Sequence, residues 1–226
     1  MDRPVLGIDT ASRRGSLAIA GAGGSVVPSE ELIEGGRHAG GLVPAIEAML
    51  ARMGLAARDL VGIGIVSGPG SFTGLKVGLA TAKGLGYALD IPVEGLSTLE
   101  AIARAVAGAV ESGPLCCLVE AGRGEVYAAR FAIEAGAARR LDPDAAWKPD
   151  ALRATLPSGA LVAGDAAPRL MAGEAPGFRA VELPALAPVV AAWARAVIPA
   201  GARYRPGGPT PNYVRPSDPE AARRPR

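Results

Sequence analysis

The chain has few of the residues on which enzymes most often depend. Its 226 residues include one histidine, His38, and two cysteines, Cys116 and Cys117. A single histidine excludes H-E-x-x-H and every other metal motif that needs two histidines, and it leaves only His38 for a histidine-based triad. Neighbouring cysteines in a strand point to opposite faces, so they predict neither a disulfide framework nor a metal site. We therefore expect no metal, no cofactor and no hydrolytic site of the common kinds.

Aromatic residues and long apolar runs are also scarce. Aromatics make up 4% of the chain, which argues against stacking platforms for single-stranded nucleic acid. No run approaches the roughly 18 apolar residues of a membrane helix. The N-terminus Met-Asp-Arg-Pro-Val-Leu-Gly-Ile-Asp lacks the apolar core of a signal peptide. We expect a cytoplasmic protein with no membrane contact.

The net charge of +2 is unevenly distributed along the chain. Residues 200–226 hold six arginines against Asp218 and Glu220, so their net charge is +4 and that of the remainder is −2. A basic tail can touch RNA, but the mildly acidic body argues against a direct tRNA-binding module, since phosphate contacts need clustered Lys and Arg. The tail arginines are Arg203, Arg205, Arg215, Arg223, Arg224 and Arg226.

The most informative motif begins with the apolar run Val61–Val66, which is typical of a buried strand. Gly68-Pro69-Gly70 follows and allows a sharp turn, because glycine accepts positive φ and proline fixes its own φ. Ser71 or Thr73 can then cap a helix whose free N–H groups point back at the turn. Such a terminus attracts phosphate, although an unliganded strand-to-helix turn explains the same spacing.

The standard nucleotide fingerprints are absent from this loop. In a P-loop the second glycine would fall at position 73, but here it is Gly74, and Lys76 is displaced as well. The dinucleotide pattern G-x-G-x-x-G also needs its third glycine at position 73, which is Thr73. The loop therefore does not identify a nucleotide by itself.

Small residues recur at every fourth position of the expected helix 71–89. Interior glycine costs a helix roughly 0.5–1 kcal/mol relative to alanine, so this stripe indicates a close neighbour on that face. The neighbour is a helix of the same chain or of another subunit, and Gly78→Leu is expected to disrupt the contact. The stripe consists of Gly74, Gly78, Ala82 and Gly86.

Alternating strand and helix patterns predict an α/β fold with two lobes. Each lobe opens with a β-hairpin whose turn carries an acidic residue, Asp9 in the first and Glu120 in the second, which indicates an internal duplication. We expect an N-terminal lobe over 1–112, a C-terminal lobe over 113–202 and an extended tail over 203–226. Further predicted elements are strands 5–8, 16–20, 25–33, 61–66, 91–96, 115–120, 125–131 and 161–165, and helices 38–53 (regular from about 42 because of Pro44), 71–89, 98–110 and 186–198.

The duplicated lobes with acidic hairpin turns resemble the actin, sugar kinase and Hsp70 (ASKHA) superfamily, with a reduced second lobe. Within it the chain resembles the bacterial TsaB (YeaZ) family over residues 5–215. It departs from the family pattern at Glu120, Gly122 and Lys76, where aspartate, arginine and arginine are usual. The matching segments are Val5-Leu-Gly-Ile-Asp-Thr10, Gly68-Pro-Gly-Ser-Phe-Thr-Gly-Leu75, Leu96-Ser-Thr-Leu-Glu100, Glu120-Ala-Gly-Arg-Gly-Glu-Val-Tyr127 and Pro211-Asn-Tyr-Val-Arg215.

The resemblance implies a non-catalytic scaffold that helps to transfer a threonylcarbamoyl group to N6 of adenosine 37 in tRNAs reading ANN codons. It implies binding to a catalytic TsaD-type paralogue, docking of a TsaE-type ATPase on that pair, contact with tRNA only through the complex, and homodimers when the chain is alone. The contacting helices would be 40–53 and 73–89, and His38 precedes the first with a cap, surface or chemical role left open. The expected interface residues are Leu42, Ile46, Leu75, Gly78, Leu79 and Ala82.

The alternative reading is an enzyme, an ATP-binding small-molecule kinase or acyltransferase of the same superfold. Under this hypothesis a phosphate loop would lie between the first hairpin turn and the glycine loop, and Gly164-Asp165 would approach the adenosine. If the chain is a scaffold, the same phosphate loop would be vestigial. Tight binding of ATP with magnesium would support the enzyme. The candidate phosphate-loop residues are Asp9, Thr10, Gly68, Gly70 and Ser71.

Overall fold

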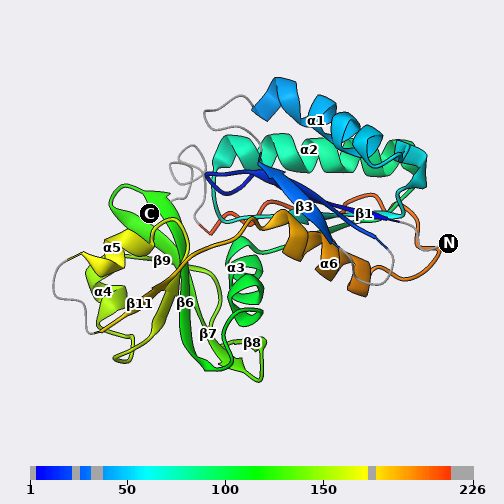
Figure 1. The fold of residues 1–226 in the computed structure, drawn as a ribbon. Helices are drawn as coiled ribbons and strands as arrows, with labels where there is room; N and C mark the ends of the chain where they lie inside the picture. Colours follow the sequence, from blue (N-terminus) through cyan, green and yellow to red (C-terminus); the bar gives the residue numbers. More distant parts are fainter. Residues whose placement is uncertain (1–3, 22–25, 32–37, 173–176, 215–226) are drawn as a thin grey trace.

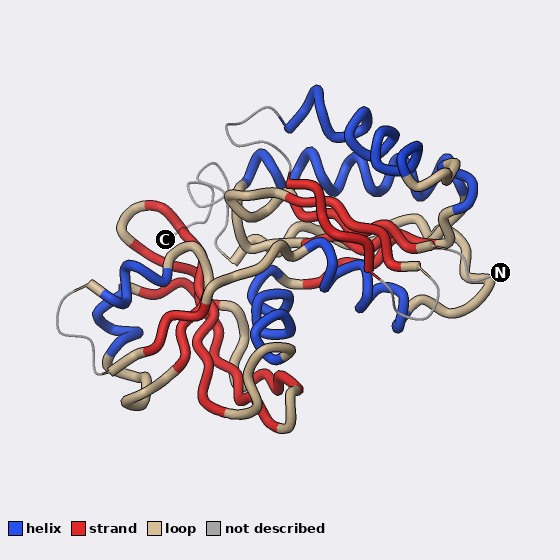
Figure 2. Tube along the Cα trace, viewed as in Figure 1, coloured by secondary structure: helices blue, strands red, loops and turns tan. Residues whose placement is uncertain are grey.

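A computed structural model of the chain describes residues 4–21, 26–31, 38–172 and 177–214. It contains two β-sheets, each with helices packed on it, and the sheets lie beside one another (Figure 1). Figure 2 shows the same arrangement, with the strands in two groups and helices covering both faces of the first. None of the helices in these described parts is both long and apolar enough to cross a membrane.

The first sheet has five strands in the order β3-β2-β1-β4-β5. β1 pairs antiparallel with β2 and parallel with β4, β2 pairs antiparallel with β3, and β4 pairs parallel with β5. The strands are β1 (Val5–Asp9), β2 (Ser16–Ala20), β3 (Val26–Glu31), β4 (Gly62–Val66) and β5 (Val93–Leu96).

The second sheet repeats this pattern in the order β11-β10-β6-β7-β8. β6 pairs antiparallel with β7 and parallel with β10, β7 pairs antiparallel with β8, and β10 pairs parallel with β11. A short additional strand, β9, also pairs with β7. The strands are β6 (Gly113–Gly122), β7 (Glu125–Glu134), β8 (Ala137–Arg140), β9 (Ala145–Trp147), β10 (Leu161–Ala163) and β11 (Arg179–Val181).

The two sheets therefore share one topology, with β6, β7, β8, β10 and β11 in the places of β1, β2, β3, β4 and β5. This confirms the expected fold class, an α/β chain of the actin-like kind with a duplicated hairpin. The second lobe is reduced, because the helices between its strands have only five residues each. The helices are α1 (His38–Arg52), a 3-10 turn (Ala57–Asp59), α2 (Phe72–Leu89), α3 (Thr98–Ala107), α4 (Pro149–Arg153), α5 (Ala167–Met171) and α6 (Ala187–Val197).

Helix α6 lies very close to the first sheet, on the face opposite α1 and α2 (Figure 1). Glycines in the strands allow this approach. A Cβ on Gly7 would lie 2.3 Å from the Ala187 carbonyl oxygen, and one on Gly64 would lie 2.6 Å from that of Val190. Every residue of β1, β2 and β4 is buried, as expected for strands covered on both faces.

One hydrophobic cluster extends through both lobes. It joins Val66 and Leu75 of the first lobe to α3 and to the face of the second sheet that carries Phe131. Val190 of α6 belongs to the same cluster. Because this core is continuous, the two lobes share apolar surface that neither could bury alone.

Two expectations about these elements need comment. The regular part of α1 was expected from about residue 42, but the helix begins at His38 and includes Pro44. Pro44 removes one N–H donor on an exposed side of the helix, while burial of Leu42, Ile46 and Met49 holds the helix in place. The domain boundaries at 112/113 and 202/203 stay a prediction, and any such division must place α6 with the sheet that it covers.

Candidate functional site at the inter-lobe cleft

A cleft of about 670 Å³ lies between the lobes, next to the loop that the sequence singles out. One wall comes from the β1–β2 turn and the start of α2. The other comes from the β6–β7 hairpin and from Asp165, two residues after the end of β10. The lining residues are Ala11, Ser12, Arg13, Gly70, Ser71, Phe72, Thr73, Val119, Glu120, Ala121, Tyr127 and Asp165.

Asp9 ends β1 and turns its carboxylate toward its own hairpin turn. Oδ1 accepts hydrogen bonds from the backbone N–H groups of Ala11 (2.9 Å) and Ser12 (3.1 Å), and Oδ2 accepts one from the Ser12 hydroxyl. The residue is 1% exposed. Its charge is therefore used to stabilise the turn, as aspartate commonly does in such positions.

Thr10 joins this turn to helix α2. Its hydroxyl donates a 2.8 Å hydrogen bond to the carbonyl oxygen of Gly74. A Cβ on Gly74 would lie 1.9 Å from the Thr10 carbonyl oxygen, and one on Gly78 would lie 2.1 Å from the Thr10 hydroxyl oxygen. The first two turns of α2 thus pack directly against the hairpin, and only glycine fits there.

The glycine loop completes this junction. Gly68 has φ +104°, a region that favours glycine. The Ser71 N–H donates to the Ala11 carbonyl oxygen (2.9 Å), and the Ser71 hydroxyl caps α2 by accepting from the Gly74 N–H (3.2 Å). The structure therefore brings together all five candidate phosphate-loop residues, Asp9, Thr10, Gly68, Gly70 and Ser71. Their role toward a phosphate stays a prediction, because the side chains of Asp9, Thr10 and Ser71 all bond to this chain's own backbone.

The opposite wall of the cleft carries two carboxylates, Glu120 and Asp165, and an arginine outside the lining pairs with Glu120. The backbone N–H of Glu120 donates to Asp165 Oδ1 (3.1 Å), and Arg169 Nε donates to Glu120 Oε1 (2.8 Å). Burial raises the pKa of Asp165, against the opposing effect of the hydrogen bond from Glu120. The sequence patterns assigned no role to Arg13 or Tyr127, because only the packing of the two lobes brings these residues together at the cleft.

The described residues contain no group of three or more His, Cys, Asp or Glu that could hold a metal ion. Cys116 and Cys117 are both buried and lie in different hydrophobic clusters, one on each side of β6. Burial raises the pKa of Cys116 to about 12 and that of Cys117 well above its ordinary value. The side chain of His38 lies outside what the structure describes.

The expected interface residues lie on α1 and α2 but face inward. Each is buried in this chain's own core, so these side chains hold the two helices on the sheet. The large apolar side chains that the same helices expose are Val43, Phe72 and Tyr87, which are 43%, 48% and 75% exposed. The inward-facing set is Leu42, Ile46, Leu75, Gly78, Leu79 and Ala82.

The small-residue stripe of α2 also faces this chain's own sheet. Gly74 and Gly78 lie against Thr10, and a Cβ on Gly86 would lie 2.4 Å from Val93 of β5. The close neighbour is therefore a hairpin turn and the sheet below it, rather than the helix that the spacing suggested. The spacing could not make this distinction, because a strand and a helix both require small residues at a close approach.

Comparison with known proteins gives several consistent matches. The family model described as "TsaD: tRNA N6-adenosine threonylcarbamoyltransferase" matches residues 17–170. An uncharacterised protein of Mycobacterium tuberculosis is 38% identical over 128 residues, 56% of this chain and 58% of that protein. The tRNA threonylcarbamoyladenosine biosynthesis protein TsaB of Bacillus subtilis is 34% identical over 107 residues, 47% of this chain and 46% of that protein. The chain thus spans about half the length of the curated relatives it matches.

The fold has a counterpart among solved structures. YeaZ from Pseudomonas aeruginosa aligns with a TM-score of 0.74 at 24% identity and covers 93% of this chain and 99% of that one. This likeness supports the fold, while the family follows from the sequence matches. Since the family model covers more than half of the residues and relatives named TsaB are 31–34% identical over about half of the chain, the chain belongs to the TsaB (YeaZ) branch of this family.

Proposed function

We propose that this chain takes part in forming N6-threonylcarbamoyladenosine in tRNA, as a non-catalytic subunit that binds a TsaD-type catalytic partner. The names of its relatives and the matching family model support the pathway. A TsaE-type ATPase would join the pair, and tRNA would reach the chain only through the complex. Alone, the chain would pair with a second copy through the same surface.

The observation that carries this proposal is the outer layer formed by α1 and α2. This layer covers one face of the first sheet, and its inward side chains are fully used by the core. Its outward side presents Val43 and Tyr87 together with the small residues Ala48, Ala80 and Gly84. Small exposed residues allow another helix to approach closely, and exposed apolar side chains favour its association.

Gly84 offers a sharp test of this surface. A Cβ at Gly84 would meet no atom within 4 Å, so a large side chain fits there without disturbing the fold. Gly84→Arg is therefore expected to weaken binding of the TsaD-type partner at least about tenfold, while far-ultraviolet circular dichroism stays unchanged. Ala196→Arg is the matched control, because Ala196 is exposed on α6, across the sheet from α1 and α2.

Calorimetric titration of the partner into each variant measures the effect. Partner binding by Gly84→Arg at wild-type affinity would move the interface away from these helices. No binding by the wild-type chain would refute the partnership itself. A reconstituted tRNA modification assay with and without the chain then tests the scaffold role, since equal multiple-turnover product in both reactions would exclude it.

The alternative, an ATP-binding kinase or acyltransferase, draws support from the cleft, which has charged residues on both walls. It is weakened by the hydrogen bonds that already engage the side chains of Asp9, Thr10 and Ser71. Calorimetry with ATP and magnesium separates the two proposals, because micromolar binding would favour the enzyme.

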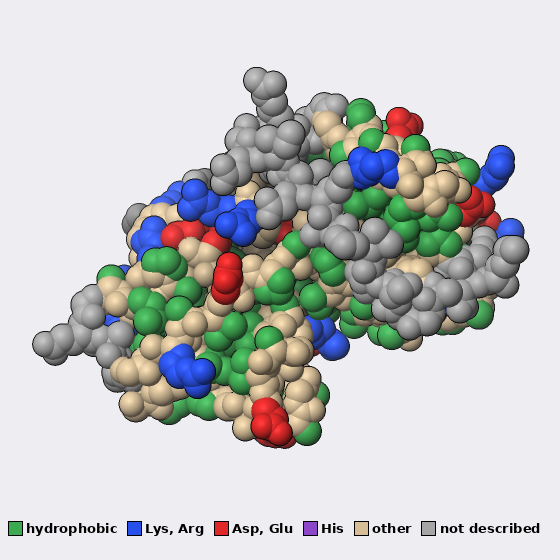
Figure 3. All heavy atoms as spheres, in the orientation of Figure 1, with side chains coloured by type: hydrophobic (Ala, Val, Ile, Leu, Met, Phe, Trp, Pro, Cys, Tyr) green, Lys and Arg blue, Asp and Glu red, His purple; other side chains and the backbone are tan. Residues whose placement is uncertain are grey.

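Direct tRNA binding by the chain alone has less support. Figure 3 shows basic side chains gathered toward the second lobe with acidic ones beside them. Several arginines of the second lobe are paired, including Arg169 with Glu120, Arg153 with Asp150 and Arg139 with Glu134. Paired arginines contribute less to a phosphate-binding surface. Deleting residues 216–226 is expected to leave complex formation intact.

A further inference from the structure

The residues after α6 form an ordered strap, defined here as 199–214, that has no helix or strand but returns along the first lobe (orange to red in Figure 1). It contacts α2 at three points. Tyr204 packs edge-on against Tyr87, with 5.8 Å between ring centroids. Gly207 accepts a hydrogen bond from Lys83 (3.4 Å), and Tyr213 lies 5.5 Å from the ring of Phe72. The strap therefore runs antiparallel to α2 along its whole length.

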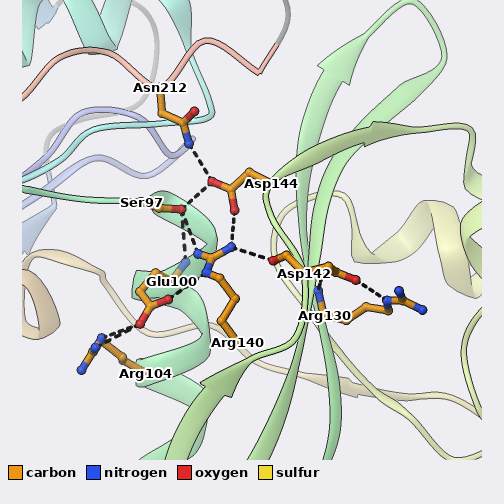
Figure 4. Close-up of polar contacts among 8 residues, drawn as sticks. All are labelled: Ser97, Glu100, Arg104, Arg130, Arg140, Asp142, Asp144 and Asn212. Atoms are coloured by element: carbon orange, nitrogen blue, oxygen red, sulfur yellow. Dashed lines mark hydrogen bonds and ion pairs between the residues drawn. The ribbon is translucent and has the colours of Figure 1, made fainter.

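The strap is fastened at Asn212, which bonds to both lobes. Its backbone N–H donates to the carbonyl oxygen of Ser67 in the loop before α2 (2.7 Å). Its side-chain Nδ2 donates to Asp144 Oδ2 in the second lobe (2.6 Å), as Figure 4 shows. One residue thus ties the start of α2 to the connection between β8 and β9.

Asp144 is the centre of a larger polar network across the lobe boundary. The same Oδ2 accepts from the hydroxyl of Ser97, the residue that caps α3 (2.7 Å). Oδ1 accepts from Arg140 (2.6 Å), which also donates to Glu100 of α3 (3.2 Å), as Figure 4 shows. The Arg140 guanidinium also lies over the Phe131 ring. The Asp144 side chain is 8% exposed, so these charge-assisted bonds form largely away from water.

We propose that the strap holds the two lobes in a fixed relative position and also holds the loop that precedes α2. The hydrogen bond from Asn212 to Asp144 fastens the strap to the second lobe. The strap also contacts the cleft wall, because Tyr213 packs against Phe72, a lining residue. Loss of the bond between Asn212 and Asp144 would make the end of the strap and the 67–71 loop more mobile. It would also let the two lobes move relative to each other. This inference does not depend on the proposed function.

Hydrogen exchange of the isolated full-length chain tests whether the bond between Asn212 and Asp144 holds the strap and the 67–71 loop. Asn212→Ala is expected to speed amide exchange about tenfold in segments 67–75 and 207–213, since a hydrogen bond to a charged group is lost. Exchange in β6 and β7 should stay unchanged. Arg139→Ala is the control, because its exposed ion pair with Glu134 lies on the same lobe but outside the network. Unchanged exchange in Asn212→Ala would overturn the proposal.

Swapping the two side chains distinguishes loss of this pairing from a general loss of folding. Asn212→Asp places two carboxylates together and is expected to raise the rate of amide exchange more than Asn212→Ala does. Adding Asp144→Asn restores an amide–carboxylate pair with the roles reversed, so exchange in segment 207–213 should fall again. If the double variant exchanged as fast as Asn212→Asp, the direct pairing of these two residues would be refuted.

A distance measurement tests whether the strap restrains the relative position of the two lobes. Spin labels on Glu47→Cys in α1 and Ala137→Cys in β8 report the distance between the lobes, because both positions are exposed. Cys116 and Cys117 are buried and should stay unlabelled. Asn212→Ala is expected to broaden the distance distribution relative to Arg153→Ala, whose bonds stay within the second lobe and outside this network. An unchanged distance distribution would refute the claim that the strap restrains the two lobes.

Discussion

At the scale of single residues, the glycines of α2 differ in what lies beside them. A Cβ on Gly78 would meet the Thr10 hydroxyl oxygen at 2.1 Å, while one on Gly84 would meet nothing within 4 Å. Thr10 cannot turn away easily, because it is β-branched and its hydroxyl is bonded to Gly74. The same substitution should therefore have opposite effects at the two positions.

Gly78→Ala is expected to lower the free energy of unfolding by about 1–3 kcal/mol through overpacking. Gly84→Ala is expected to raise it by about 0.5–1 kcal/mol, because alanine favours the helix. Urea denaturation of both variants measures the difference. Equal effects of the two substitutions would show that the close contact with Thr10 is not a constraint on the helix.

Asp165 should give the chain a specific pH dependence. Burial raises the pKa of Asp165 in the folded state, so the folded chain binds this proton more tightly than the unfolded chain does. The contribution of Asp165 to stability therefore falls as pH rises from its unfolded pKa through its raised folded pKa. Asp165→Asn removes the buried charge and can keep the acceptor for the Glu120 N–H.

The stability of Asp165→Asn relative to wild type is thus expected to be greater at neutral pH than at pH values below both pKa values of Asp165. Denaturant titrations of both proteins across this range measure the difference. A difference that stays constant with pH would mean that this carboxyl is not perturbed in the folded chain.

At the scale of elements, two serines cap two helices but have different additional partners. Ser71 caps α2 by accepting from Gly74, whereas Ser97 caps α3 and also donates to Asp144. Ser71→Ala is expected to cost about 1 kcal/mol of unfolding free energy, a typical value for a lost cap. Ser97→Ala is expected to cost about 2–3 kcal/mol, because a bond to a charged group is lost as well.

Thermal or denaturant unfolding of the two serine variants compares these costs directly. Adding Asp144→Ala to each variant supplies the control. Because Asp144 bonds to Ser97 and not to Ser71, the double variant with Ser97→Ala should show a coupling energy and the one with Ser71→Ala should not. Additive costs in both pairs would contradict the role given to Ser97.

The long elements could be predicted from the sequence, and several short ones could not. The periodic runs of α2 and α6 and the paired hairpin strands predicted their elements to within a few residues. The strands β9 and β11 and the helices α4 and α5 have three to five residues, too few for a periodic pattern. They form because the second sheet provides a partner for each.

At the scale of the whole molecule, the two tryptophans report on different parts of one core. Trp193 of α6 packs on the cluster that spans both lobes, and Trp147 of β9 packs on the cluster at the far side of the second sheet. Since the spanning cluster joins the lobes, we expect them to unfold in one cooperative step.

Single-tryptophan variants test this cooperativity. Trp147→Phe and Trp193→Phe each leave one reporter, and their fluorescence transitions in urea are expected to coincide with the loss of far-ultraviolet circular dichroism within each variant. A Trp193 transition at lower urea than the loss of second-lobe structure would mean that the lobes unfold separately. The continuous core would then contribute little to coupling.

The sequence by itself determined the fold class, the duplicated hairpins and the family, because strand runs, glycine turns and a local motif are encoded by neighbouring residues. It also marked α1 and α2 as important, but it could not separate their inward residues from their outward ones. Only the tertiary structure decided that the small-residue stripe faces Thr10 and the sheet, that α6 covers the first sheet, and that Asn212 meets Asp144. The contacts of Thr10 with Gly74 and of Asn212 with Asp144 join residues 64 or more positions apart, and packing in three dimensions, rather than local periodicity, sets such pairs.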